Sequence, residues 1–182
     1  MKKTYAMLAI GLATALAAGT AMAQMSPPAP DKAARQTSKS ADKASQSFIK
    51  AAIEGDIAEI DLGKLAQENE AVKQFGAMLV KDHGAHKAKA EEVAIQLGVT
   101  PPTGSTFGEK ATYAKLKLLQ GDSFDRSFAK SMVKDHQDDI KEYKKEASKN
   151  DAAGQLAKAT LPTLQKHLQA AQRLTAEKQS SR

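Results

Sequence analysis

VKQFGAMLVKDHGAHKAKAEEVAIQL (72–97) decides the fold class, because its apolar side chains recur at the spacing of a helix rather than of a strand. Intervals of three and four residues place one side chain per turn on the same face of an α-helix. The residues on this face are Val72, Phe75, Leu79, His83, His86, Ala90, Val93 and Leu97. The pattern predicts an amphipathic helix over about 70–97, with Gly98 as its C-cap.

The same periodicity extends over most of the chain. It predicts long helices over about 45–68, 123–148 and 152–177, and a short helix over about 109–119. Pro101, Pro102 and two glycines mark 99–108 as a loop. Four long amphipathic helices without a strand pattern predict an all-α four-helix bundle. The long connection between the second and third of them, with its short helix, can cross the bundle and favours a ferritin-like topology.

The N-terminus has the features of an export signal. Lys2 and Lys3 precede the apolar run 5–19, and Ala21-Met22-Ala23 offers small residues to a signal peptidase. We therefore expect residues 1–23 to be a signal peptide cleaved after Ala23, and the protein to lie in the periplasm, with an association with the outer membrane as a further expectation. The Pro-, Ser- and Lys-rich segment 24–44 predicts a flexible tether, 45–177 the bundle, and 178–182 a polar tail.

Composition excludes several classes of function. The 182 residues include 27 Lys and Arg against 21 Asp and Glu, without clustering of basic and aromatic residues, so nucleic-acid binding has no support. No cysteine is present, which excludes disulfides, thiolate zinc sites, Fe–S clusters and covalent c-type haem. We expect no transmembrane span after signal cleavage; an envelope partner or self-association stays open.

Several segments in a fixed order resemble a known family. They are FIKAAIEGDIAEIDLGKLA (48–66), MLVKDH (78–83), FDRSFAKSMVKDH (124–136) and LPTLQKHL (161–168). Together with the exported N-terminus, they resemble the bacterial family catalogued as domain of unknown function 4142 (DUF4142) over about 45–176. The resemblance implies an exported, ferritin-like helical bundle, often labelled an outer-membrane protein, and implies no established activity.

All four histidines of the chain fall on or beside the predicted apolar faces. They are His83, His86, His136 and His167. Asp82 and Asp135 each precede one of these histidines, and Glu54 and Glu59 face inward or nearly so from the first helix. His83 and His86 are three residues apart and so share one face. We expect the four histidines, with Asp82, Asp135 and Glu59, to meet in one interior zone.

Two interpretations of this zone remain. The Glu-x-x-His pairs of ferritin-like di-metal sites are absent, which disfavours ferroxidase chemistry and favours histidines packed as structural polar residues. The alternative is a transition-metal site for zinc, copper or iron, to which Met132 would add a thioether one turn before His136. Non-covalent haem between Met78 or Met132 and His167 has no supporting spacing.

We therefore expect an exported envelope bundle without an evident catalytic site, and with a binding or stress-protective role. Neither a nucleophile elbow nor a phosphate-binding loop is present. The alternative function is a small metal-binding bundle that stores, buffers or senses a transition metal through its core His and Asp side chains.

Overall fold

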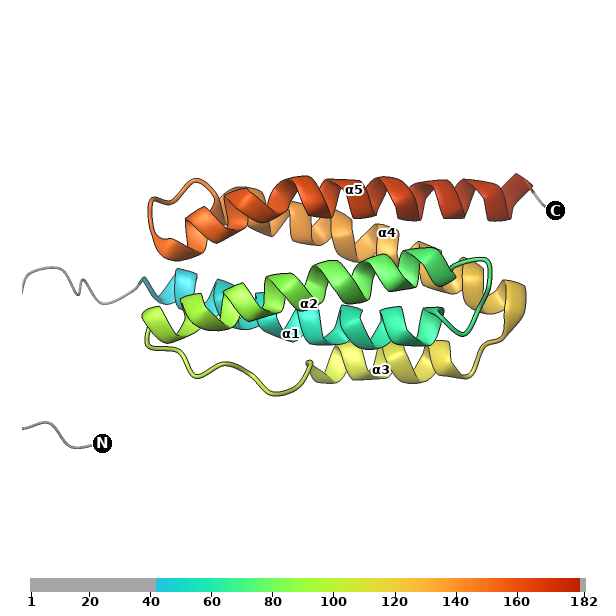
Figure 1. Cartoon of the computed structure of the whole chain (residues 1–182), viewed down its shortest axis with the longest axis horizontal. Coiled ribbons are helices and arrows are strands. Elements are labelled where there is room, and N and C mark those ends of the chain that lie inside the picture. Colours follow the sequence, from blue (N-terminus) through green and yellow to red (C-terminus); the bar gives the residue numbers. More distant parts are fainter. Residues whose placement is uncertain (1–41, 181–182) are drawn as a thin grey trace, which may run out of the picture. The chain divides into compact units, whose positions relative to one another are not determined.

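The computed structural model describes residues 42–180, which form five α-helices and no strand. The signal peptide and nearly all of the tether predicted from the sequence lie outside these residues. Figure 1 shows four long helices, α1 (Lys43–Ala66), α2 (Lys73–Gln96), α4 (Gly121–Glu146) and α5 (Ala152–Ser180), and the shorter α3 (Phe107–Lys117). The all-α prediction is confirmed.

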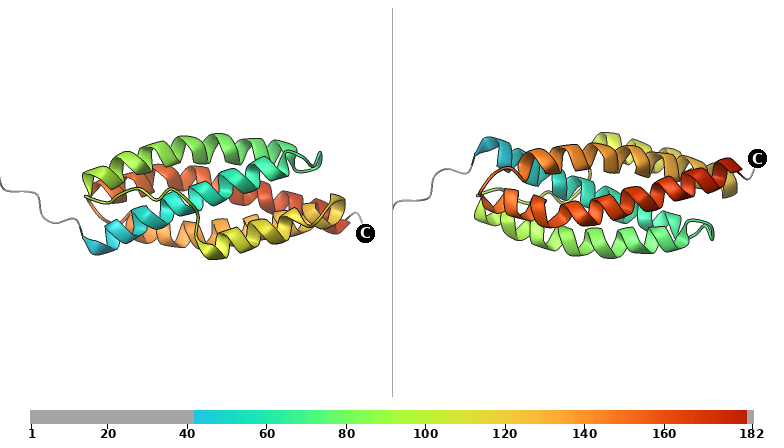
Figure 2. Two further views of the ribbon diagram at one scale, coloured as in Figure 1. Left: turned by 90° about the horizontal axis from the view of Figure 1, so that it is seen from below. Right: turned by 90° about the horizontal axis from the view of Figure 1, so that it is seen from above.

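The long helices pair as two antiparallel hairpins. α1 packs along α2, and α4 packs along α5, while α2 and α5 form the main contact between the two pairs (Figure 2). The chain between α2 and α4 runs back along the bundle and includes α3, which rests on α1 and α4. Among the described residues, no helix is both long and apolar enough to cross a membrane.

The helix ends follow from local chemistry. α1 begins two residues before its predicted start, because the Asp42 carboxylate accepts the amide hydrogen of Ala44. α2 ends at Gln96 with Leu97 as its C-cap, one residue before the predicted cap. Gly98 follows with a left-handed φ of 71°, which lets the Val99 amide reach the Ala94 carbonyl at 2.8 Å.

Charged side chains stabilise both ends of α5. Asp151 caps its first turn by accepting the Gly154 amide at 2.8 Å. It continues to Ser180, three residues past the predicted end, and Lys178 in its last turn pairs with Asp122 and Asp125 of α4.

A close approach of two backbones sets the register of α1 against α2. A Cβ atom at Gly76 would lie 2.5 Å from the Gly63 carbonyl oxygen, and one at Gly63 would lie 2.8 Å from the Gly76 carbonyl oxygen. Only glycine allows this contact. The hairpin therefore has a fixed register, which determines which side chains of α1 face the histidines of α2.

The apolar core is divided along the bundle. One cluster, with Phe75, Phe124 and Phe128, fills the end near the α1–α2 turn. Two further clusters, built around Ile49 and Ile140, fill the opposite end. The residues between these clusters are polar, and they form the candidate site.

Candidate metal centre

A buried layer of charged side chains crosses the middle of the bundle. It receives Asp56 and Glu59 from α1, His83 and His86 from α2, His136 from α4 and His167 from α5. Each of these six side chains is buried, and His136 and His167 are fully so. Because isolated charges are rarely buried, their mutual pairing decides the chemistry of the layer.

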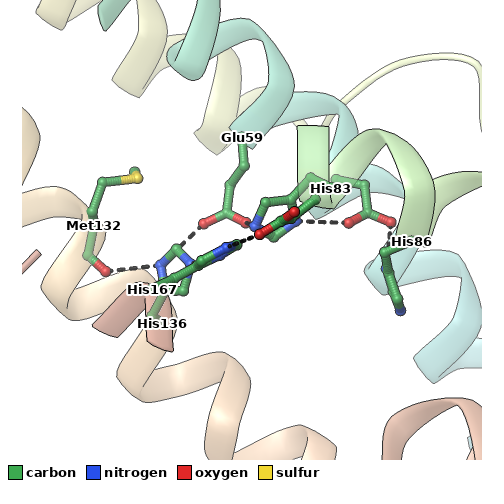
Figure 3. Close-up of polar contacts among 8 residues, drawn as sticks. Glu59, His83, His86, Met132, His136 and His167 are labelled. Atoms are coloured by element: carbon green, nitrogen blue, oxygen red, sulfur yellow. Dashed lines mark hydrogen bonds and ion pairs between the residues drawn. The ribbon is translucent and has the colours of Figure 1, made fainter. Parts of the chain in front are cut away.

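Glu59 lies between two histidine rings, as Figure 3 shows. Its Oε2 is 2.7 Å from His83 Nε2, and its Oε1 is 3.3 Å from His136 Nδ1. Neither Glu59 Oε1 nor His83 Nε2 has a partner in hydrogen-bond geometry. These contacts are therefore ionic. Glu59 Oε1 still has an unused lone pair, and His83 Nε2 still has an unused proton.

The Asp56 carboxylate accepts a hydrogen bond from each of two histidines of α2. Its Oδ1 accepts from His83 Nδ1 at 2.9 Å, and its Oδ2 accepts from His86 Nδ1 at 2.7 Å. His83 is therefore oriented by Asp56, so that its Nε2 faces Glu59. His86 points away from Glu59, and its Nε2 is buried without a hydrogen bond.

His136 and His167 form a relay whose outer ends are fixed by oxygen acceptors. His136 Nδ1 donates to the Met132 carbonyl at 3.0 Å, and His167 Nε2 donates to Asp82 Oδ2 at 3.0 Å. Between the rings, His136 Nε2 and His167 Nδ1 are 3.2 Å apart. When each ring is neutral, both protons are on the outer nitrogens and two lone pairs face each other. A proton or a metal ion between the two nitrogens would relieve this repulsion.

The surrounding charges shift the pKa values of the layer in opposite directions. Burial lowers the pKa of His83, but Glu59 and Asp56 more than offset it and raise this pKa to about 10. Burial, with the charges of His83 and His136, lowers the pKa of His167 to about 4 despite its bond to Asp82. Burial raises the pKa of Glu59, but the neighbouring histidines hold it well below its usual range. At neutral pH, Glu59 is thus an anion and the His167 ring is neutral.

Three of the four histidines converge. One ring nitrogen from each of His83, His136 and His167 lies within 4.8 Å of the other two. His86 stays outside this group, although it shares Asp56 with His83. Asp82 takes part through His167, as expected from its place in the sequence.

Asp135 lies beside the histidine zone, near Glu59, without a direct bond to a histidine of the described chain. No hydrogen bond or ion pair joins it to a histidine among the described residues, and it accepts from Ser131 at 3.2 Å. With Glu59 and Asp139 it lines a cavity of about 380 Å³ between α1, α3 and α4. Burial and the charge of Glu59 raise the pKa of both aspartates. Glu59 thus borders both the histidine layer and this cavity.

Met132 contributes its backbone rather than its sulfur. Figure 3 shows the thioether pointing away from the histidines, and the side chain belongs to the apolar cluster of Phe124 and Phe128. The Met132 thioether therefore loses its support as a ligand, and a donor set of nitrogen and oxygen atoms remains.

Comparisons with known proteins place the chain in a family but give it no activity. The sequence matches the family described as "Domain of unknown function (DUF4142)" over residues 28–174. A crystal structure of a DUF305 fragment from Deinococcus radiodurans is similar in fold, with a TM-score of 0.67 at 14% identity. The match covers 75% of this chain and 98% of that fragment. No curated protein matches the sequence.

Proposed function

This chain belongs to the DUF4142 family, and from its buried histidine layer we propose that it binds one transition-metal ion through His83, His136, His167 and Glu59. The proposal includes export: the bundle would act in the bacterial envelope as a metal store, buffer or sensor. The ferritin-like topology and the periplasmic location belong to the same proposal.

The observation that carries the proposal is the set of oxygen acceptors that hold the three histidines. Each has one nitrogen held by an oxygen acceptor: Asp56 for His83, the Met132 carbonyl for His136, and Asp82 for His167. Metal-binding histidines are held in the same way, because an acceptor on one nitrogen orients the ring and directs the other nitrogen to the metal. A purely structural network does not require the free nitrogens to converge.

The spacing of the histidine nitrogens supports binding of a single ion, to which Glu59, 2.7 Å from His83 Nε2, would add a carboxylate oxygen. Two nitrogens bound tetrahedrally at about 2.0–2.1 Å lie about 3.3 Å apart. The inner nitrogens of His136 and His167 are 3.2 Å apart, already at this spacing. The His83 ring would lose a proton, and the distance from its nitrogen to each of the other two would shorten by about 1.5 Å at most, from the 4.8 Å limit on the group to about 3.3 Å.

The donor set favours zinc and also accommodates copper(II) or iron(II). Three imidazoles and one carboxylate are borderline donors, and no sulfur ligand is present to select copper(I). The ion would replace the proton on His83 and leave a single carboxylate, Glu59, in contact with it. One inner carboxylate is too few for the two cations of a di-iron oxidase, so we propose no oxidase activity.

The test is a titration of the metal-free protein with zinc, using a chelator competition to measure the dissociation constant and the stoichiometry. One zinc per chain is expected. His167→Leu removes a ligand while filling its space, and its partner Asp82 keeps some contact with solvent, with 22% of its side chain exposed. This variant should lose zinc binding, whereas His86→Leu is the matched control and should retain it.

Thermal melting of both variants separates loss of the site from loss of the fold. A ligand that binds only the folded state raises the melting temperature by mass action. Zinc should therefore raise the melting temperature of the wild type and of His86→Leu, and leave that of a folded His167→Leu unchanged. Equal zinc responses in all three proteins would refute the proposal.

A further inference from the structure

The outer face of α3 carries an apolar stripe that no other part of the described chain covers. Phe107 is 88% exposed and Leu118, at the end of the helix, is 84% exposed. Ala111 and Ala114 between them are also exposed. The spacings of four, three and four residues place all four on one face of the helix.

The opposite face of α3 holds the helix firmly on the bundle. Leu116 is buried, and Tyr113 and Leu119 pack against the apolar cluster of α1, α2 and α4. A capping box between Thr106 and Glu109 fixes its first turn. The stripe is therefore presented outward by a rigid helix at the edge of the bundle (Figure 1).

Lysines border the stripe on both sides. By helical geometry, Lys110 and Lys117 lie on one flank and Lys115 on the other, and all three are exposed. An apolar face between two rows of cations is the pattern of a helix that lies in the interface of an anionic bilayer. The apolar side chains enter the acyl region, and the ammonium groups reach the lipid phosphates.

We propose that the outer face of α3, with Phe107 and Leu118 as apolar anchors and Lys110, Lys115 and Lys117 as flanking cations, docks the protein on an anionic lipid surface. A second copy of the chain fits this face less well, because pairing two stripes would bring six lysines together. The proposal rests on α3 alone and is independent of the metal centre.

The test uses the processed protein purified from an expressing bacterium. Its N-terminus is checked by mass spectrometry, because a retained apolar run 5–19 would itself bind lipid. The chain has no tryptophan, so Phe107→Trp introduces a single reporter. Its emission should shift to the blue with vesicles containing phosphatidylglycerol and should not shift with phosphatidylcholine vesicles. Ile95→Trp, at a 69% exposed position on α2, is the matched control and should not respond.

Co-sedimentation measures the affinity. The double change Phe107→Glu with Leu118→Glu should reduce partitioning to anionic vesicles at least tenfold, and Ile95→Glu should leave it unchanged. Replacing one flanking lysine with glutamine should reduce it up to about fivefold, and added salt should weaken all binding. These exposed changes should leave the helical circular dichroism unaltered.

Three results would overturn the proposal. The first is no binding of the wild type to anionic vesicles, and the second is an equal loss of binding in Ile95→Glu. The third is a wild-type protein that does not bind vesicles but self-associates with rising concentration, when the double variant does not self-associate. That last result would make the stripe a protein interface.

Discussion

The stability of the metal-free protein should depend on pH through His83. The pKa of this ring rises from 6.5 to about 10 on folding, because Glu59 and Asp56 outweigh the effect of burial. A group with a raised pKa contributes its full stability below the unfolded value, and loses it as the pH rises towards the folded value. Above pH 6.5, the folded protein holds one proton that the unfolded chain releases, so the free energy of unfolding should fall by about 1.4 kcal/mol per pH unit.

From pH 6.5 to 8.5 this amounts to a loss of about 2 kcal/mol, because the unfolded ring is still half protonated at pH 6.5 and the full slope applies only above about pH 7.5. On the acid side, folding lowers the pKa of His167 to about 4. Below pH 6.5 the unfolded chain therefore binds a proton at this ring, whereas the folded protein does not. Stability should therefore fall in that direction too, and the maximum should lie near pH 6.5.

Urea unfolding followed by circular dichroism, in the presence of a chelator, measures both slopes. His83→Gln should remove the alkaline slope, whereas His86→Gln should keep it. Saturating zinc should also abolish it, because the bound ion takes the place of the proton. A free energy of unfolding that stays constant from pH 6.5 to 8.5 in the wild type would refute the charge assignment of the layer.

Three further predictions concern packing and the support of the centre. Gly76→Ala should lower the free energy of unfolding by about 1–3 kcal/mol through overpacking against Gly63, whereas Gly84→Ala, with nothing within 4 Å of its Cβ, should raise it by about 0.5–1 kcal/mol; urea titration of both checks this. Phe128→Ala removes a fully buried ring stacked on its neighbour one turn earlier, and should cost about 3–5 kcal/mol in the same assay. Asp56→Asn should weaken zinc binding about 10–100-fold in chelator competition, because the carboxylate orients a ligand without touching the ion; an unchanged affinity would remove Asp56 from the site.

Periodicity was sufficient to predict the helices and the inward histidines. The three- and four-residue spacing that places Phe75 and Leu79 in the core carries on to His83 and His86, so burial of these rings follows from the pattern. Local rules determine these features, because each depends on neighbours within one or two turns.

The pairing of side chains between helices could not be predicted in the same way. Asp56 lies four residues after Ala52 and three before Glu59, on the buried face, and this spacing was the available signal. Its role depends on the register of α1 against α2, which the Gly63–Gly76 contact sets and no local pattern reveals. The contacts of Asp135 could not be predicted either. It precedes His136 by one residue, which corresponds to about 100° around the helix, so its side chain faces the cavity beside α3.

A crystal structure of the zinc-loaded protein with anomalous diffraction at the zinc edge tests the central claim most directly. We predict one anomalous peak per chain, inside the bundle, about 2.0–2.2 Å from a nitrogen of each of His83, His136 and His167 and from a carboxylate oxygen of Glu59. Zinc found only at surface carboxylates, with the inner nitrogens of His136 and His167 still bridged by a proton, would contradict it.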